Sequence, residues 1–278
     1  MNEFVEVVLG SLIVIPIAAG YLGLDWVKAN AGFGMAFQTM PYLFQQWGSV
    51  LAAIAGVMWF GLLFFAGITS SLAMGTPWMG FMRDEFNWGR KKGAWSFGAL
   101  ALILGLPTVF FYQQGVFDEY DYWAGTVSLV VFAMLETIVF AWIFGMDKGW
   151  KEINSGADIK IPQFFRYVIK FVTPIMLIII FLGSLFKPLN NNWSNAINNL
   201  FSGNGWVLDN SSIIKTLNHA AIKEQLLVAK DTVQIAALQD KMFYTNIARL
   251  LLVSLFIFIS ALVYIAYKKR VKEGRATL

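Results

Sequence analysis

The sequence has no cysteine and only one histidine, His219, among its 278 residues. Without cysteine the chain can form neither a disulfide nor a thiolate nucleophile, and a single imidazole excludes a histidine-rich metal site. Charged residues are also scarce, at 14% of the composition. The sequence offers neither a Ser/His pair nor the paired carboxylates that hydrolytic or metal-dependent catalysis needs. We therefore expect that the protein is not an enzyme.

Apolar surface is what the sequence has in abundance. Hydrophobic residues make up 58% of the chain and aromatic residues 16%, and the mean hydropathy is +0.60. A soluble domain of this size cannot bury so many apolar side chains. The formal net charge of +4 does not indicate a nucleic-acid partner, because the basic residues cluster beside apolar runs. The composition predicts an all-α integral membrane protein whose partner is the lipid bilayer.

Apolar runs of roughly 20 residues are long enough to cross a hydrocarbon core about 30 Å thick. The sequence contains six, which predict transmembrane helices at about 4–24, 48–81, 94–112, 122–146, 165–186 and 243–267. The second run is too long for a perpendicular crossing, so we expect that helix to tilt or to extend beyond the bilayer. The stretch 25–47, rich in glycine and aromatic residues, predicts short interfacial or re-entrant pieces.

Basic residues set the expected orientation of these helices. Lys and Arg are frequent at 83–93, at 147–164 and in the C-terminal tail, whereas 113–121 contains none. Cytoplasmic loops carry the excess of positive charge, so we expect these three segments and both termini in the cytoplasm. The cell membrane, as in a bacterial inner membrane, is the expected location. The N-terminal residues lack the charged region and cleavage site of a signal peptide, so we expect no cleaved leader.

The long loop 187–242 is expected on the extracellular side. Its first part, 190–206, is rich in asparagine and glycine and predicts irregular structure. Its second part, 211–241, spaces Ile, Leu and Val among Lys, Glu and Gln. This spacing predicts a short amphipathic helix.

The stretch FFAGITSS, residues 64–71, places a glycine and three hydroxyl residues inside the second apolar run. On a helix, Ala66, Thr69 and Ser70 fall within an arc of roughly 100°, and Ser71 and Met74 continue the same side. Hydroxyls in a helix can bond back to the carbonyl four residues earlier. Neutral oxygens suit a monovalent cation such as sodium, but small and hydroxyl residues are also ordinary contacts between membrane helices. The spacing alone leaves both interpretations open.

Ionisable groups lie in two of the expected spans. Asn2 and Glu6 are one helical turn apart at the start of the first, and Glu136 is in the middle of the fourth. Ionisable residues inside a membrane are costly and indicate function by default, although Glu6 could also lie at the membrane surface. We expect Glu136 to face the interior of the helix bundle.

Five stretches resemble, in order, segments of the neurotransmitter:sodium symporter family, and especially of its bacterial members. They are NEFVEVVLGSLIVIP, LLFFAGITSSLA, GFMRDEFNWGRKKG, FDEYDYWAGT and ETIVFAWIFGMDKGWKEIN. The resemblance is colinear over residues 2–186 and looser in the last helix. It implies that the six spans correspond to the seventh to twelfth helices of the inverted-repeat sodium symporter fold. The implied function is sodium-dependent symport of an amino acid or similar small amine.

The resemblance also implies ligands for two sodium ions and a substrate. The Ala66 carbonyl and the hydroxyls of Thr69 and Ser70 match ligands of the second sodium, and Asn2 matches a ligand of the first. The positions of Ser71 and Met74 match the substrate pocket.

Three carboxylates complete the implied machinery. Glu6 matches the position of a built-in negative charge that offsets sodium in chloride-independent members, so we expect no chloride requirement. Asp84 and Asp121 match the acidic halves of a cytoplasmic and an extracellular gate. Without the resemblance, a solvated acid in a loop would be an equally good interpretation of both residues.

The resemblance covers only the second half of the family's fold. The expected partner is therefore the missing N-terminal half, which supplies the arginines for Asp84 and Asp121 and further sodium ligands. We expect that the chain alone would not transport. The alternative is a non-transporting membrane scaffold or degenerate fragment, in which the motifs serve only to pack helices.

Overall fold

The computed structural model describes residues 2–29 and 35–274. Every regular element in these ranges is a helix, and the sole bridge between extended residues there joins Pro188 to Leu208. The chain divides into two compact units, Met1–Phe97 and Gly98–Leu278, with the boundary inside one helix. The all-α class expected for a membrane protein is confirmed, and each unit is described below by itself.

The first unit consists of two long helices, short helical pieces and the start of a third helix. In order these are α1 (Asn2–Leu22), α2 (Leu24–Ala29), the π-helical η1 (Met35–Thr39), α3 (Met40–Gln45), α4 (Ser49–Phe86) and the first part of α5 (Arg90–Phe110). The short pieces α2, η1 and α3 occupy the stretch for which interfacial segments were predicted. Leu43 and Phe44 of α3 are buried, and Val14 of α1 and Trp59 of α4 pack against them. This contact fixes α3 between two long helices.

A close approach joins α4 to α5. α4 ends at Asn87, whose left-handed backbone lets its N–H and that of Trp88 return to carbonyls of the last turn. Above the turn, the Trp78 indole donates a hydrogen bond to Ser96 Oγ at 2.9 Å. One turn earlier, a Cβ at Gly75 would lie 2.8 Å from the Phe97 ring. Gly75 is therefore glycine because the aromatic ring occupies the space of a side chain.

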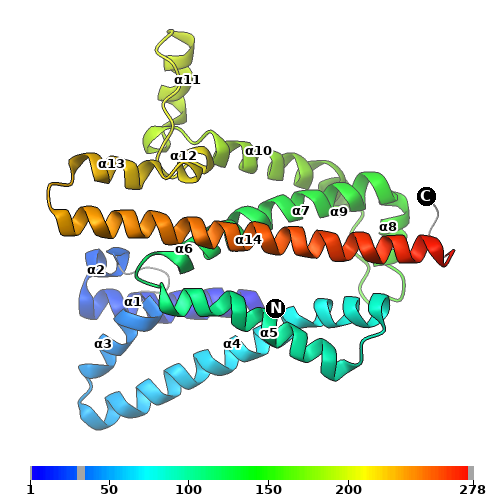
Figure 1. The fold of residues 1–278 in the computed structure, drawn as a ribbon, viewed down its shortest axis with the longest axis horizontal. Coiled ribbons are helices and arrows are strands. Elements are labelled where there is room, and N and C mark those ends of the chain that lie inside the picture. The colour runs from blue at the N-terminus through cyan, green and yellow to red at the C-terminus, as the bar shows by residue number, and fades with distance from the viewer. Residues whose placement is uncertain (1, 30–34, 275–278) are drawn as a thin grey trace. The chain divides into compact units, whose positions relative to one another are not determined.

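The second unit contains the remaining helices (Figure 1). They are α6 (Val116–Tyr120), η2 (Asp121–Val127), α7 (Ser128–Ile138), η3 (Val139–Gly145), α8 (Met146–Ile153), α9 (Phe164–Tyr167), η4 (Val168–Val172), α10 (Thr173–Leu185), η5 (Leu189–Asn191), α11 (Trp193–Phe201), α12 (Ile213–Leu217), α13 (Ala220–Val228) and α14 (Thr232–Lys272). The elements η2, η3 and η4 are π-helical turns within longer continuous helices, and η5 is a short 3₁₀ turn.

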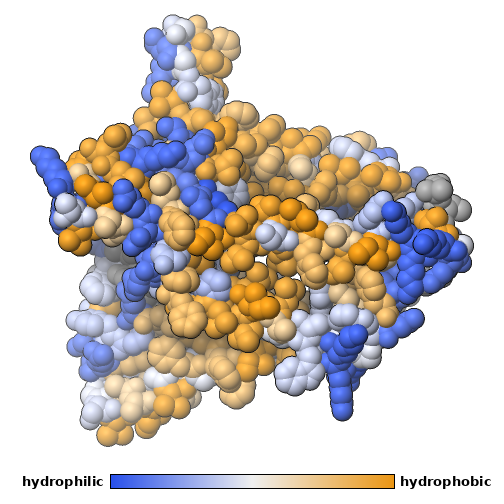
Figure 2. Space-filling view, viewed as in Figure 1, coloured by the Kyte–Doolittle hydropathy of each residue, from blue (hydrophilic) through white to orange (hydrophobic). Residues whose placement is uncertain are grey.

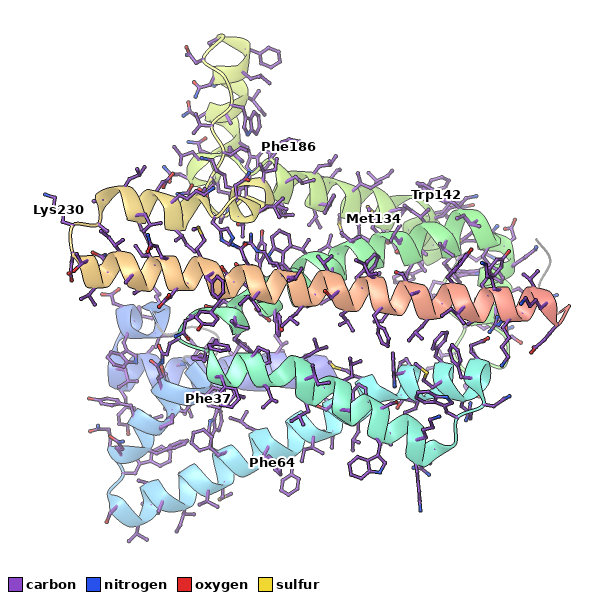
Figure 3. The ribbon with its side chains drawn as sticks, in the orientation of Figure 1. Phe37, Phe64, Met134, Trp142, Phe186 and Lys230 are labelled. Carbon is purple, nitrogen blue, oxygen red and sulfur yellow. The ribbon has the colours of Figure 1, made fainter. Side chains whose placement is uncertain are left out.

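α7 and α10 pack side by side in this unit. The Trp142 indole of η3, labelled in Figure 3, donates a hydrogen bond to the carbonyl of Lys170 in η4 at 2.8 Å. α14 runs along the same unit and packs against α6 near the N-terminal end of the α6–α8 helix. α8 and the C-terminal end of α14 lie toward the opposite end (Figure 1).

Five helices of the described chain are long and apolar enough to cross a membrane. They are Ser49–Phe86, Arg90–Phe110, Val116–Ile153, Phe164–Leu185 and Thr232–Lys272. These agree with the second to sixth predicted spans, and Figure 2 shows the hydrophobic side chains that cover the visible face of the helices. The first predicted span coincides with α1, several of whose side chains lie outside the described residues. At most 6% of each apolar window is buried by the chain itself, so these surfaces are available to lipid or to other protein.

The loop 187–242 differs from the sequence-based expectation. The segment 190–206, predicted to be irregular, contains α11, because the side chain of Asn192 caps its N-terminus by accepting a hydrogen bond from the Asn195 N–H. The stretch 211–241, for which one short amphipathic helix was predicted, contains two short helices and the start of α14. α12 and α13 are separated by His219, whose backbone is left-handed with φ of 52°. The last helix begins already at Thr232, where the Asp231 carboxylate caps it.

The packing of Gly75 yields the first prediction. Gly75→Ala should destabilise the protein by about 1–3 kcal/mol, because the new methyl group must displace the Phe97 ring from a filled contact. The measurement is the thermal unfolding midpoint in detergent.

The matched control is Gly67→Ala on the same helix, where a Cβ would meet nothing within 4 Å. It should leave the midpoint unchanged or raise it slightly, because alanine favours a helix interior over glycine by about 1 kcal/mol. Equal effects at both positions would contradict the Phe97 contact.

Candidate functional site

The hydroxyl-rich stretch 64–71 lies in the middle of α4, and the helix continues through it without a break. The Thr69 hydroxyl lies 3.0 Å from the carbonyl oxygen of Phe65 and 3.0 Å from that of Ala66. The predicted bond to the carbonyl four residues earlier is therefore confirmed. One proton is shared between two carbonyls, and one of these is the Ala66 carbonyl expected to bind sodium.

This arrangement decides how the stretch could hold a cation. A hydroxyl that donates its proton keeps its oxygen lone pairs free, so Thr69 can donate to Phe65 and still present oxygen to an ion. The Ala66 carbonyl accepts one helical hydrogen bond and has a second lone pair. When the Thr69 hydroxyl turns wholly to Phe65, that lone pair becomes available. The site can thus form by rotation of one hydroxyl, without unwinding the helix.

The expected ligands on α4 share one property, which is exposure. Ala66, Thr69, Ser70, Ser71 and Met74 are all exposed, and Met74 has 74% of its surface accessible. Figure 3 shows the neighbouring Phe64 projecting away from α4, with 63% of its surface accessible. Any further ligands of an ion bound here must approach this uncovered surface.

Two expected residues lie in α1. Asn2 and Glu6 are one turn apart on its backbone, as predicted. Their side chains lie outside the described residues, so their roles as sodium ligand and compensating charge stay predictions.

The first proposed gate residue has a partner that the sequence analysis did not expect. Asp84 Oδ1 lies 2.9 Å from Nε of Arg83, the preceding residue. The expectation that Asp84 would lack an arginine in this chain is therefore wrong. Both side chains are well exposed, at 72% for Arg83 and 59% for Asp84. An ion pair so exposed stabilises a protein by about 0–1 kcal/mol, and it leaves Asp84 free to exchange partners.

The second proposed gate residue, Asp121, begins η2 and is exposed. Its carboxylate leans along the helix toward Gly125, where an added Cβ would lie 3.2 Å from Asp121 Oδ1. A larger residue at 125 would push the carboxylate away. Gly125 therefore provides the space that Asp121 occupies.

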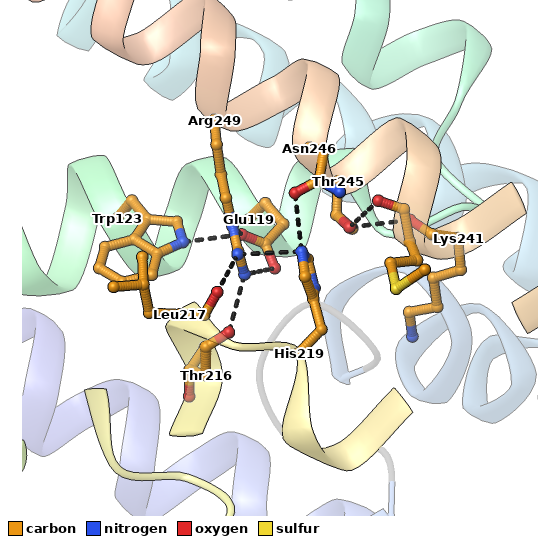
Figure 4. Close-up of polar contacts among 10 residues, drawn as sticks. Glu119, Trp123, Thr216, Leu217, His219, Lys241, Thr245, Asn246 and Arg249 are labelled. Carbon is orange, nitrogen blue, oxygen red and sulfur yellow. Dashed lines mark hydrogen bonds and ion pairs between the residues drawn. The ribbon is translucent and has the colours of Figure 1, made fainter. Parts of the chain in front are cut away.

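The most prominent polar contact of the second unit was missed by the sequence analysis. Arg249 of α14 and Glu119 of α6 form an ion pair in which Nε and Oε2 lie 2.8 Å apart (Figure 4). Their side chains are only 15% and 13% exposed. The Trp123 indole also donates to Glu119 Oε2 at 2.7 Å. A charged residue in an apolar span signals function, and Arg249, the only charged residue at 243–267, could have been found on that ground.

Four of the five N–H donors of Arg249 have oxygen acceptors, and the fifth faces the His219 ring. Nε and one terminal nitrogen bind the Glu119 carboxylate. The terminal nitrogens also reach the carbonyls of Thr216 and Leu217, each within 2.9 Å, and His219 Nε2 at 3.0 Å. A guanidinium has five donors and an ammonium three, so lysine could not replace this set.

Glu136 was expected to face the interior of the helix bundle, but it does not face the interior of this unit. It is exposed, in a shallow cavity of about 510 Å³ lined with Leu135, Val139, Phe140 and Phe144. Among the described residues, groups of three or more His, Cys, Asp or Glu side chains that could hold a metal ion are absent.

Comparison with known proteins matches this chain to a family of membrane transporters. The model of the Sodium:neurotransmitter symporter family matches residues 19–225. An uncharacterized sodium-dependent transporter of Methanocaldococcus jannaschii is 30% identical over 56% of this chain and 32% of its own length. One of Haemophilus influenzae is 30% identical over 62% of this chain and 40% of its own length.

A third relative carries a substrate class in its name. Sodium-dependent nutrient amino acid transporter 1 of Drosophila grimshawi is 26% identical over 56% of this chain and 24% of its own length. The chain therefore spans between 24% and 40% of the length of these three relatives. Because the family match extends over most of its residues, the chain, with its series of apolar helices, is a multi-pass membrane protein that belongs to the Sodium:neurotransmitter symporter family.

Proposed function

We propose that this chain is part of a sodium-coupled symporter for an amino acid or a similar small amine. The observation that carries the proposal is the exposed face of α4, where the Ala66 carbonyl and the hydroxyls of Thr69 and Ser70 lie together. The relatives named as sodium-dependent transporters support the use of sodium. The relative named as an amino acid transporter supports the substrate class.

The ligands divide between two sodium ions. Ala66, Thr69 and Ser70 contribute a carbonyl and two hydroxyl oxygens to one ion, and Asn2 contributes its amide oxygen to the other. Neutral oxygens favour a monovalent cation because a divalent one gains more from carboxylates. Ser71, the residue after Ser70, and Met74, one helical turn beyond Ser70, contact the substrate.

The remaining ligands come from the partner of this chain, an N-terminal half. The exposed surface of the α4 residues supports this, as does the small share of each relative that the chain matches. Asp84 and Asp121 act as the acidic halves of the inner and outer gates. The exposed Arg83–Asp84 pair is weak enough to yield to a partner from that half.

A second function has one observation in its favour. The Thr69 hydroxyl already has acceptors within its own helix, as it would in a non-transporting scaffold whose hydroxyls only pack helices. The sodium experiment below separates the two functions.

Removal of the α4 oxygens should weaken sodium binding. In protein that includes the N-terminal half, Thr69→Val with Ser70→Ala should raise the sodium concentration for half-maximal substrate binding about tenfold or more, because the ion loses two oxygen ligands. The measurement is radiolabelled amino acid binding at a series of sodium concentrations.

Two control variants isolate the effect. Thr69→Ser keeps the oxygen and should retain sodium dependence. Thr76→Val removes a similar exposed hydroxyl of α4, bonded to the Leu72 carbonyl at 3.2 Å, and should also behave as wild type. Unchanged sodium dependence in the double variant would favour the scaffold.

Glu6 should make transport independent of chloride by providing a fixed negative charge near sodium. Glu6→Ser removes this charge and leaves space for an anion, so uptake by the variant should require chloride. The measurement is uptake into proteoliposomes with chloride replaced by gluconate.

The control is Glu136→Gln, which removes another carboxylate from an apolar span and should leave uptake chloride-independent. Strong chloride dependence in the wild type, or none in an active Glu6→Ser protein, would show that Glu6 is not the compensating charge.

The proposed topology places both termini in the cytoplasm of a cell membrane. Because the chain has no cysteine, single cysteines report without background. Cysteines at the exposed positions Gln113 and Ser202 should react with an impermeant maleimide from outside intact cells, and one at Ser155 only after permeabilisation. Labelling of Ser155 in intact cells would invert the orientation.

A further inference from the structure

The segment 211–219, named here the outer strap, lies near η2. Ser211 lines a cavity of about 190 Å³ together with residues of η2 and α10. Leu217, at the C-terminal end of α12, lines a second cavity of about 590 Å³ together with η2 and α14. Val127 of η2 borders both cavities. The strap and η2 therefore border the same two cavities.

One end of the strap is fixed to the end of α10. Asp209 accepts hydrogen bonds from the Ser211 hydroxyl at 2.6 Å, the Ser211 N–H and the Asn190 N–H. These bonds, the Ser211 hydroxyl first, hold the pKa of Asp209 below its ordinary value. Lys187, just past α10, donates to the same hydroxyl at 2.8 Å. Ser212 is fully buried and caps α12.

The other end of the strap is fixed by Arg249. The last carbonyls of a helix have no partner within it, and a cation is favourable at this end. The Arg249 guanidinium meets both needs, because it binds the carbonyls of Thr216 and Leu217 at the end of α12. His219 extends the contact, since its Nε2 lies 2.8 Å from Asn246 of α14.

The same guanidinium holds the helix that carries the outer gate residue. Its pair with Glu119 fixes α6, and Asp121 follows on the next half-turn. The indole of Trp123 closes the contact from the η2 side, with the guanidinium 5.4 Å from its ring centre. One side chain of α14 thus joins the strap to the start of η2.

We propose that Arg249 is a positioning residue that locks the outer strap to the α6–η2 helix, so that the strap and Asp121 move as one body. The role of Asp121 as a gate residue rests on the proposed function, whereas the coupling of the strap to the α6–η2 helix does not. Opening of the outer gate then requires the strap to move with it.

Hydrogen–deuterium exchange of the purified chain in lipid nanodiscs tests the coupling. Arg249→Gln should accelerate exchange about tenfold or more in the strap and in residues 119–127 together, because a buried charge pair is broken. The matched control, Arg166→Gln, removes another arginine that pairs with an aspartate, Asp147, and should alter neither segment.

A milder variant keeps the coupling testable in case Arg249→Gln does not fold. Arg249→Lys keeps the charge but has too few donors for both Glu119 and the strap, so it should accelerate the same two segments to a smaller extent. Acceleration of one segment without the other, or of neither, in a folded variant would overturn the coupling.

Transport separates positioning from simple structural support. In protein that shows sodium-driven uptake, Arg249→Lys should lower the turnover rate per binding site several-fold and leave the KM within about twofold, because the substrate ligands lie on α4. A changed KM with an unchanged rate would overturn the positioning role. Absence of uptake in the wild type would count against the proposed function, and the exchange result would still decide the coupling.

Discussion

The constraint on which this structure depends is that a hydrocarbon layer contains no water to satisfy a backbone polar group. Each apolar span is therefore a continuous helix, and the polar side chains within the spans follow the same requirement. The hydroxyls of Thr69, Thr108, Thr137 and Thr245 all donate to carbonyls of their own helices. A bond back to the helix is thus general here and does not mark a site by itself. What distinguishes 66–71 is the density of oxygens on one exposed face.

Larger polar groups meet this requirement in a different way. Arg249 and Glu119 cannot find enough partners within their own helices, so they neutralise each other near the end of a span. A charge buried without a partner costs several kcal/mol. The guanidinium reduces this cost further by binding the carbonyls of Thr216 and Leu217 at the end of α12. The contacts that satisfy the Arg249 guanidinium therefore also hold the loop that contains α12.

The spans could be predicted from the sequence because length and hydropathy alone determine them. The described helices reproduce five of the six, and their ends lie within seven residues of the predicted ends except at Thr232, where the helix begins eleven residues early. The loop helices could not be predicted in the same way. α11 depends on the capping side chain of Asn192, and the break at His219 depends on its contact with α14. Such contacts join residues far apart in the chain, and periodicity carries no information about them. For the same reason the sequence indicated Asp121 but not the Arg249 contact beside it.

The length of α14 has a consequence for communication between the two faces of the membrane. At 41 residues and a rise of 1.5 Å per residue, the helix is about 60 Å long, roughly twice the thickness of the hydrocarbon core. Arg249 lies in its N-terminal half, and Lys268 and Lys272 lie in its last turns. A change in the tilt of this one helix would move both ends at once. The lysines at one end and the Arg249 contact nearer the other end are therefore joined by a single continuous element.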